Sequence, residues 1–199
     1  YERQGLYSKA EPLYLRALAI REKVLGPGHS DTATTLSNLA LLYDNKGLYD
    51  KAESLYIRAL AIREKVLGPG HSDTANSLNN LAALYGNQGL YSKAEPLYIR
   101  ALAIAEMIFG GEHSNTSICL DNLAGLYARQ GNYIRSVPLK RRSLQIDLTL
   151  LHRESPYLAL SDRQAFVQTV DTAYERGFFA VSRGSNGVEL ALFTRLNRQ

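Results

Sequence analysis

The chain has 199 residues, of which 45% are hydrophobic and 21% charged, a composition typical of a soluble protein with a continuous core. No apolar run approaches the roughly 18–20 residues of a membrane span, and no N-terminal signal is visible. Cys119 is the only cysteine, which excludes an intrachain disulfide and a thiolate metal cluster and favours a reducing, cytoplasmic setting. Residues 131–199 carry the whole net charge of +4, so no basic stripe for nucleic acid runs along the chain.

Glycines divide the chain into copies of a 42-residue unit, at Gly5, Gly47, Gly89 and Gly131. Residues 5–46 and 47–88 are identical at 33 of 42 positions, residues 89–130 follow the same pattern more loosely, and a degenerate fourth copy opens at Gly131. The opening "YERQG" matches "YARQG" at 127–131. These matches predict that the chain begins at the end of a repeat helix and is a fragment of a longer array.

Each copy is predicted to form two helices. In the first helix, Leu36, Leu39, Ala40 and Tyr43 lie at i, i+3, i+4 and i+7, which is one apolar stripe. We expect a glycine to end this helix, because glycine readily takes a positive φ. Side-chain oxygens for the N-cap are offered by Ser30, Asp31 and Thr32. The second stripe consists of Leu48, Ala52, Tyr56, Ala59, Leu60 and Ile62 and ends at "LGPG".

The connector "GPGHSDTA" occurs at 26–33 and again at 68–75, with a looser copy "GGEHSNTS" at 110–117. Histidine, serine and aspartate are the side chains of a hydrolase triad, but adjacent residues cannot orient one another as a triad requires. We therefore interpret the connectors as helix caps and loop packing. His29, His71 and His113 are expected to form a widely spaced ladder, and no catalytic residue, metal site or cofactor is predicted.

The pattern L-x-x-L-A-x-x-Y, followed by alanine, tyrosine and alanine on the second helix, resembles the tetratricopeptide repeat. The 42-residue period, with "KAE-x-LY-x-RAL-x-IREKVLG", resembles the kinesin-light-chain subclass. This resemblance implies an all-α fold, a right-handed α-solenoid of antiparallel helix pairs, over residues 1–151, with a C-terminal helical extension over 152–199. In the fourth copy, Ser136 and Ser143 replace the alanines of the second helix.

Residues 161–183, "SDRQAFVQTVDTAYERGFFAVSR", do not follow the repeat. Ser161 and Gln164 form a predicted capping box, and a further short helix is expected over 188–198. This segment resembles the helical connector of bacterial repeat proteins that end in a CHAT-type cysteine peptidase domain. The resemblance implies an alternative function, in which the chain is a regulatory sensor of a peptidase that lies beyond Gln199.

The leading hypothesis is a non-enzymatic scaffold that binds a peptide or protein segment in a concave groove lined by the first helices. Asn38, Asn80 and Asn122 occupy one repeat position there, and an amide can both donate to and accept from a peptide backbone. In kinesin light chains this groove is basic and takes tryptophan-plus-acidic peptides, whereas the first helices here are not basic. Self-association through an uncapped N-terminal end is a further hypothesis.

Differences between the copies extend the predicted groove. Four of the nine positions that differ between the first two copies fall at i, i+3, i+7 and i+10, on one helical face beside Asn38. A groove that reads different ligand side chains would vary in this way, although drift of solvent-facing positions is an equal alternative. The predicted groove residues are Asn38, Asn80, Asn122, Thr34, Asn76, Ser37, Asn79, Leu41, Asn45, Asn87, Asp121 and Arg129.

Overall fold

The computed structural model describes residues 2–154, and these residues contain seven α-helices. The chain divides into two compact units, residues 1–143 and residues 144–199. The described part of the second unit is the C-terminal half of the last helix, residues 144–154. The helices are α1 (Glu2–Val24), α2 (Ser30–Asn45), α3 (Tyr49–Leu67), α4 (Ser72–Asn87), α5 (Tyr91–Phe109), α6 (Ser114–Arg129) and α7 (Tyr133–Glu154).

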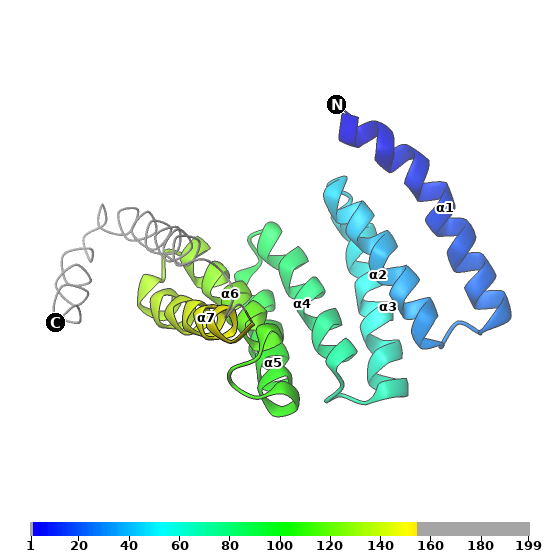
Figure 1. Ribbon diagram of the computed structural model, residues 1–199. Coiled ribbons are helices and arrows are strands. Elements are labelled where there is room, and N and C mark those ends of the chain that lie inside the picture. The colour runs from blue at the N-terminus through cyan, green and yellow to red at the C-terminus, as the bar shows by residue number, and fades with distance from the viewer. Residues whose placement is uncertain (1, 155–199) are drawn as a thin grey trace, which may run out of the picture. The chain divides into compact units, whose positions relative to one another are not determined.

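The first unit is built from antiparallel helix pairs that stack side by side (Figure 1). Helix α2 packs on α3 and α4 on α5, and each pair packs on the next through α3 with α4 and α5 with α6. The first helices also meet one another directly, α2 with α4 and α4 with α6. The prediction of a right-handed, all-α solenoid is confirmed. The extension predicted for 152–199 lies outside the described residues from 155 onward.

Small residues allow the helices of each pair to approach closely. Ala40, Ala52 and Ala59 are fully buried, and so is Leu36 on the predicted stripe. One cluster joins Leu36 and Ala33 of α2 to Ala59 and its neighbour Ile62 of α3. Burial of this apolar surface, at roughly 25 cal/mol per Å², is the main force that holds each pair together. The apolar periodicity of the sequence therefore identified most of the core, but Leu48 of the predicted second stripe is 38% exposed at the N-cap of α3 and Leu60 is only partly buried.

Glycine closes the first helices as predicted. Gly47, Gly89 and Gly131 have φ values of 72°, 75° and 73°. At the first of these turns the amide of Leu48 donates to the carbonyl of Tyr43 at 2.9 Å, and the amide of Gly47 donates to the carbonyl of Asp44 at 2.9 Å. This is the Schellman arrangement, which satisfies carbonyls at a helix end.

The expectation of a helix end at Gly5 is wrong. Helix α1 begins at Glu2 and continues through Gly5 to Val24. At the later glycines a complete first helix precedes the turn and packs on the helix after it. Gly5 is not among the glycines with a positive φ, and the helix continues through it. Glycine inside a helix costs only about 1 kcal/mol relative to alanine.

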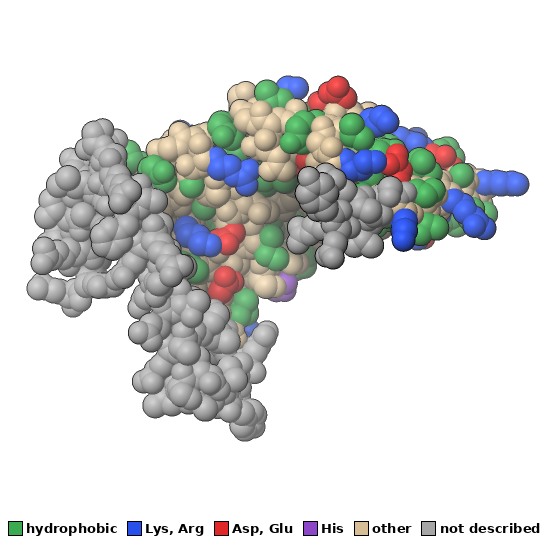
Figure 2. All heavy atoms as spheres, turned by 90° about the horizontal axis from the view of Figure 1, so that it is seen from above, with side chains coloured by type: hydrophobic (Ala, Val, Ile, Leu, Met, Phe, Trp, Pro, Cys, Tyr) green, Lys and Arg blue, Asp and Glu red, His purple; other side chains and the backbone are tan. Residues whose placement is uncertain are grey.

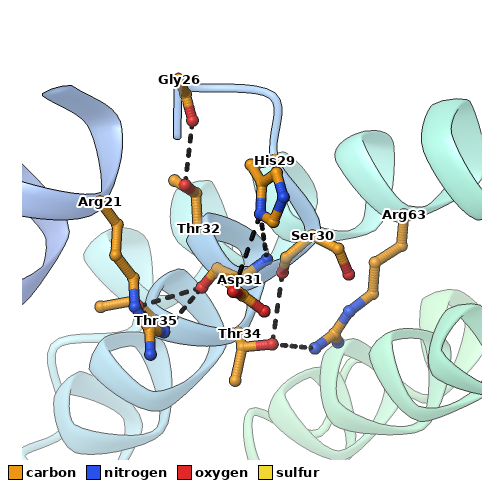
Figure 3. A network of polar contacts seen from close by, with 9 residues as sticks. All are labelled: Arg21, Gly26, His29, Ser30, Asp31, Thr32, Thr34, Thr35 and Arg63. Atoms are coloured by element: carbon orange, nitrogen blue, oxygen red, sulfur yellow. Dashed lines mark hydrogen bonds and ion pairs between the residues drawn. The ribbon is translucent and has the colours of Figure 1, made fainter. Parts of the chain in front are cut away.

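The capping oxygens predicted at the start of the first helices are also wrong, because histidine provides the cap (Figure 3). His29 is the N-cap of α2, and its Nδ1 accepts from the amide of Asp31 at 3.1 Å. Nδ1 is separated from Cα by the same number of bonds as a carboxylate oxygen of aspartate, so imidazole can occupy an aspartate-type cap. The hydroxyl of Thr32 instead donates to the carbonyl of Gly26 at 3.0 Å and ties down the connector. His71 and His113 repeat this cap on α4 and α6.

Candidate functional site

The candidate site is the first-helix face, which we define as the accessible side of α2, α4 and α6. Asn38 and Asn80 are exposed on it, and Asn122 is half-buried. No hydrogen bond joins these three amides to another described residue. Leu41 is 51% exposed on the same face, and Asn45 and Asn76 are exposed as well. The face thus offers polar amides at a regular interval together with apolar surface.

Other predicted groove residues bond to one another across the first helices. Asn87 of α4 donates to a carboxylate oxygen of Asp44 on α2 at 3.4 Å, and its carbonyl oxygen accepts from Arg129 of α6 at 3.3 Å. Burial raises the pKa of Asp44, and the hydrogen bond from Asn87 partly opposes that rise. The amide therefore lies between a carboxylate and a guanidinium and links three repeats.

Thr34 connects the first-helix face to a buried arginine. Its hydroxyl donates to the carbonyl of Ser30 at 3.3 Å and accepts from Arg63 at 3.2 Å (Figure 3). Arg63 also donates to the hydroxyl of Ser77 at 2.6 Å, so that α3 is joined to both α2 and α4. The side chain of Arg63 is buried, and this burial lowers its pKa.

The repeat position of Ser37, Asn79 and Asp121 departs from the expected free face. Ser37 is only 7% exposed. Asn79 is half-buried and its amide nitrogen lies 3.3 Å from the sulfur of Cys119 on α6, as donor to it. Asp121 accepts from Lys140 on α7 at 2.7 Å and 2.8 Å. A ligand would reach Asn79 and Asp121 only in competition with these contacts inside the array, although both side chains are partly exposed.

Charge on the molecule is mixed in sign. In the view of Figure 2, basic and acidic side chains are interspersed among apolar and uncharged ones, and no large patch of either sign gathers. Several of these charges pair across successive second helices, as Arg58 does with Glu22 at 2.6 Å and Arg100 with Glu64 at 2.6 Å. Such a surface suits a ligand held by its backbone and apolar side chains better than a polyanion.

A periodic clamp between repeats went unnoticed in the sequence. The hydroxyl of Tyr85 on α4 donates to Glu53 on α3 at 2.7 Å, and Lys93 of α5 lies over the tyrosine ring, 4.9 Å from its centroid. The same arrangement joins Tyr43 to Glu11 and Tyr127 to Glu95. The tyrosine and the glutamate recur every 42 residues, and the cation over the ring is Lys51, Lys93 and then Arg135, so the signal was present in the repeat itself.

The clamp predicts how stability responds to alkaline pH. Burial and the bond to Glu53 raise the pKa of Tyr85 to about 12, above the usual value of about 10. As pH rises above about 10, the hydroxyl ionises first in the unfolded chain, so we expect the free energy of unfolding to fall towards pH 12. The free energy of unfolding can be measured in urea at several pH values for the parent and for Tyr85→Phe. Plotted against pH, the two free energies should converge between about pH 10 and 12. Parallel curves would contradict the assignment.

The described residues offer neither a metal site nor a membrane-spanning helix. No group of three histidine, cysteine, aspartate or glutamate side chains in residues 2–154 is placed to hold a metal ion. Within the same residues, no helix has the length and apolar character needed to cross a membrane.

Stacked antiparallel helix pairs that recur every 42 residues define a helical-repeat protein. The chain belongs to the tetratricopeptide repeat family, whose profile matches residues 1–65, 45–106 and 73–149. A search of curated proteins gave no match.

Solved structures agree with this family and with the kinesin-light-chain-like subclass. BtubC (BKLC) from P. vanneervenii is 26% identical with a TM-score of 0.68, over 75% of this chain and 60% of that one. The nearly identical TPR-like repeats of Podosopora anserina, assigned to a kinesin light chain, are 25% identical with a TM-score of 0.62, over 75% of this chain and 71% of theirs. Our chain therefore spans less than two thirds of the length of BtubC.

Proposed function

We propose that this chain is a non-enzymatic scaffold that binds an extended peptide or protein segment across its first-helix face. The observation that carries the proposal is the row of amides formed by Asn38, Asn80 and Asn122, one on each of three adjacent first helices and without an internal hydrogen bond. Tetratricopeptide repeats generally mediate protein–protein interaction, and this supports the class of ligand.

The spacing of the amides suits a peptide that crosses the helices. Packed helices lie about 8–10 Å apart, and an extended chain advances about 3.3 Å per residue. One amide can therefore meet the peptide backbone at about every third residue, whatever the side chains are. Leu41 on α2 and Ile118 on α6 are 51% and 55% exposed at opposite ends of the face, where they can contact apolar ligand side chains.

The test is selection from a random peptide library against the parent protein and against the triple variant Asn38→Ala/Asn80→Ala/Asn122→Ala. Each amide hydrogen bond contributes about 0.5–1.5 kcal/mol, so peptides captured by the parent should bind the triple variant at least about tenfold more weakly. Circular dichroism checks that both proteins are folded, and fluorescence anisotropy with the captured peptides gives the affinities.

A matched control changes three exposed residues of the second helices, Ser54→Ala, Lys65→Ala and Ser92→Ala. This control should bind the captured peptides as the parent does. Equal binding by the parent and the asparagine variant would move the site away from the first-helix face and overturn the proposal.

The alternative, a sensor segment of a CHAT-type peptidase, depends on residues 161–198 and on sequence beyond Gln199. Those residues lie outside the described part of the chain, so the alternative stays a hypothesis from sequence resemblance.

A further inference from the structure

The last helix pair differs from the earlier pairs at positions that touch. In α2 with α3, and in α4 with α5, alanine faces alanine at the close helix contact, as in the pair Ala75 and Ala101. In α6 with α7 the same two repeat positions hold Ser117 and Ser143. These serines are 3% and 0% exposed, so two hydroxyls replace two methyl groups at the same depth.

The two hydroxyls form a hydrogen-bonded cluster with an ion pair. The hydroxyl oxygens of Ser117 and Ser143 lie 3.0 Å apart, and Ser143 donates to Asp121 at 2.6 Å. Asp121 also accepts from Lys140, which occupies the repeat position held by Tyr56 and Tyr98 in earlier copies. We call Ser117, Asp121, Lys140 and Ser143 the polar cluster.

Each half of the polar cluster needs the other half. If α7 packed on α4 instead of α6, Ser143 would face Ala75, and Lys140 would face the amide of Asn79 rather than a carboxylate. If α5 occupied the place of α7 against α6, Asp121 would face Tyr98 and lose its cation. The cost falls mainly on the buried hydroxyl of Ser143, which would lose its acceptor, because the side chains of Lys140 and Asp121 are 45% and 39% exposed and their ion pair contributes less. Alanine against alanine is neutral to such a change.

A chain of nearly identical repeats needs a feature that tells the correct partner helix from its copies in other repeats. Residues 5–46 and 47–88 agree at 33 of 42 positions, so a shift by one repeat preserves most apolar contacts. Apolar packing specifies size and shape only loosely, while a hydrogen-bonded cluster with two buried hydroxyls at its centre favours one partner over the others. We propose that the polar cluster determines which first helix α7 packs against, and so fixes the order of the repeats at this end of the array.

The first test exchanges the two halves separately in the full chain. Ser117→Ala/Asp121→Asn gives α6 the residues of α4, and Lys140→Tyr/Ser143→Ala gives α7 the residues of α5. Each exchange alone should lower hydrogen-exchange protection of the amides in 133–143 by about tenfold or more. The combination of both exchanges should restore protection to within about threefold of the parent, because the alanine pair is re-formed. Additive losses in the combined variant would overturn the proposal.

The second test measures the choice of partner helix with two deletions of equal length. Removal of residues 89–130 joins α4 to α7, whereas removal of residues 47–88 keeps α6 beside α7. Protection in α7 should match the parent in the second deletion and fall about tenfold in the first, with recovery on Ala75→Ser/Asn79→Asp. Circular dichroism checks that both deletion variants are folded. If one of them is unfolded, the substitutions of the first test, made in the full chain, decide whether the proposal holds. Equal protection of α7 in two folded deletions would contradict discrimination by the cluster.

Discussion

Replacement of Leu78 by alanine is expected to lower the free energy of unfolding by about 2–5 kcal/mol. Leu78 of α4 is 0% exposed and lies in a cluster with Ala75, Ala101 and Ile104. Alanine neighbours have no side-chain freedom with which to fill the space that the leucine leaves. The cost therefore includes the residual cavity as well as the lost transfer free energy.

The loss of stability on replacing Leu78 should extend beyond α4. Helix α4 packs on α3 before it and on α5 after it, so damage here weakens two interfaces of a one-dimensional array. We expect the urea transition to broaden and hydrogen-exchange protection to fall on both sides of α4. The matched control is Leu41→Ala on α2, which is 51% exposed and should change stability by at most about 0.5 kcal/mol. A loss below about 1 kcal/mol at Leu78 would show that the array adapts to the cavity.

The fold could be predicted from the sequence because its determinants are local and repeated. The stripe through Leu36 and Tyr43 has the helical period, and Gly47 marks the turn by its need for a positive φ of 72°. Prediction of the helix caps from residue preferences failed, because a residue other than serine, threonine or aspartate accepts the hydrogen bond at the start of α2. His29 caps α2 through Nδ1, although oxygens were expected, because capping requires only an acceptor at the right distance.

The candidate site was harder to predict, because contacts between helices determine which of its side chains are accessible to a ligand and which are already bonded within the array. Asn38 and Asn87 look alike in the sequence, but only Asn87 bridges Asp44 and Arg129. Asp121 meets Lys140, a partner 19 positions away, at a geometry set by the packing of α7 on α6. A sequence period shows which positions are equivalent, but which of them are occupied by neighbours depends on the three-dimensional stacking of the repeats.

Replacement of Arg63 by methionine is expected to raise the free energy of unfolding by about 1–3 kcal/mol. Arg63 is 7% exposed, its Nε has no partner, and its guanidinium donates to the hydroxyls of Thr34 and Ser77. A buried guanidinium that meets hydroxyls alone recovers less of its hydration energy than one paired with a carboxylate. Burial accordingly lowers the pKa of Arg63, and the charge of Asp73 opposes this lowering only in part.

The hydroxyls left behind can be satisfied within their own helix. Thr34 still donates to the carbonyl of Ser30, and the counterpart of Ser77 in the preceding repeat, Thr35, donates to the carbonyl four residues before it at 3.2 Å. The next repeat supports the exchange, since Ala105 and Cys119 occupy the positions of Arg63 and Ser77 and are both buried.

The control for Arg63→Met is Arg58→Met on the same helix, where the guanidinium is accessible and pairs with Glu22 at 2.6 Å. Loss of that exposed pair should lower stability by at most about 1 kcal/mol, so the two substitutions are expected to have opposite signs in urea unfolding. A clear loss of stability at Arg63 would mean that its bonds across α2, α3 and α4 outweigh the cost of burying its charge. In that case the arginine would be a net stabilising link between the two repeats.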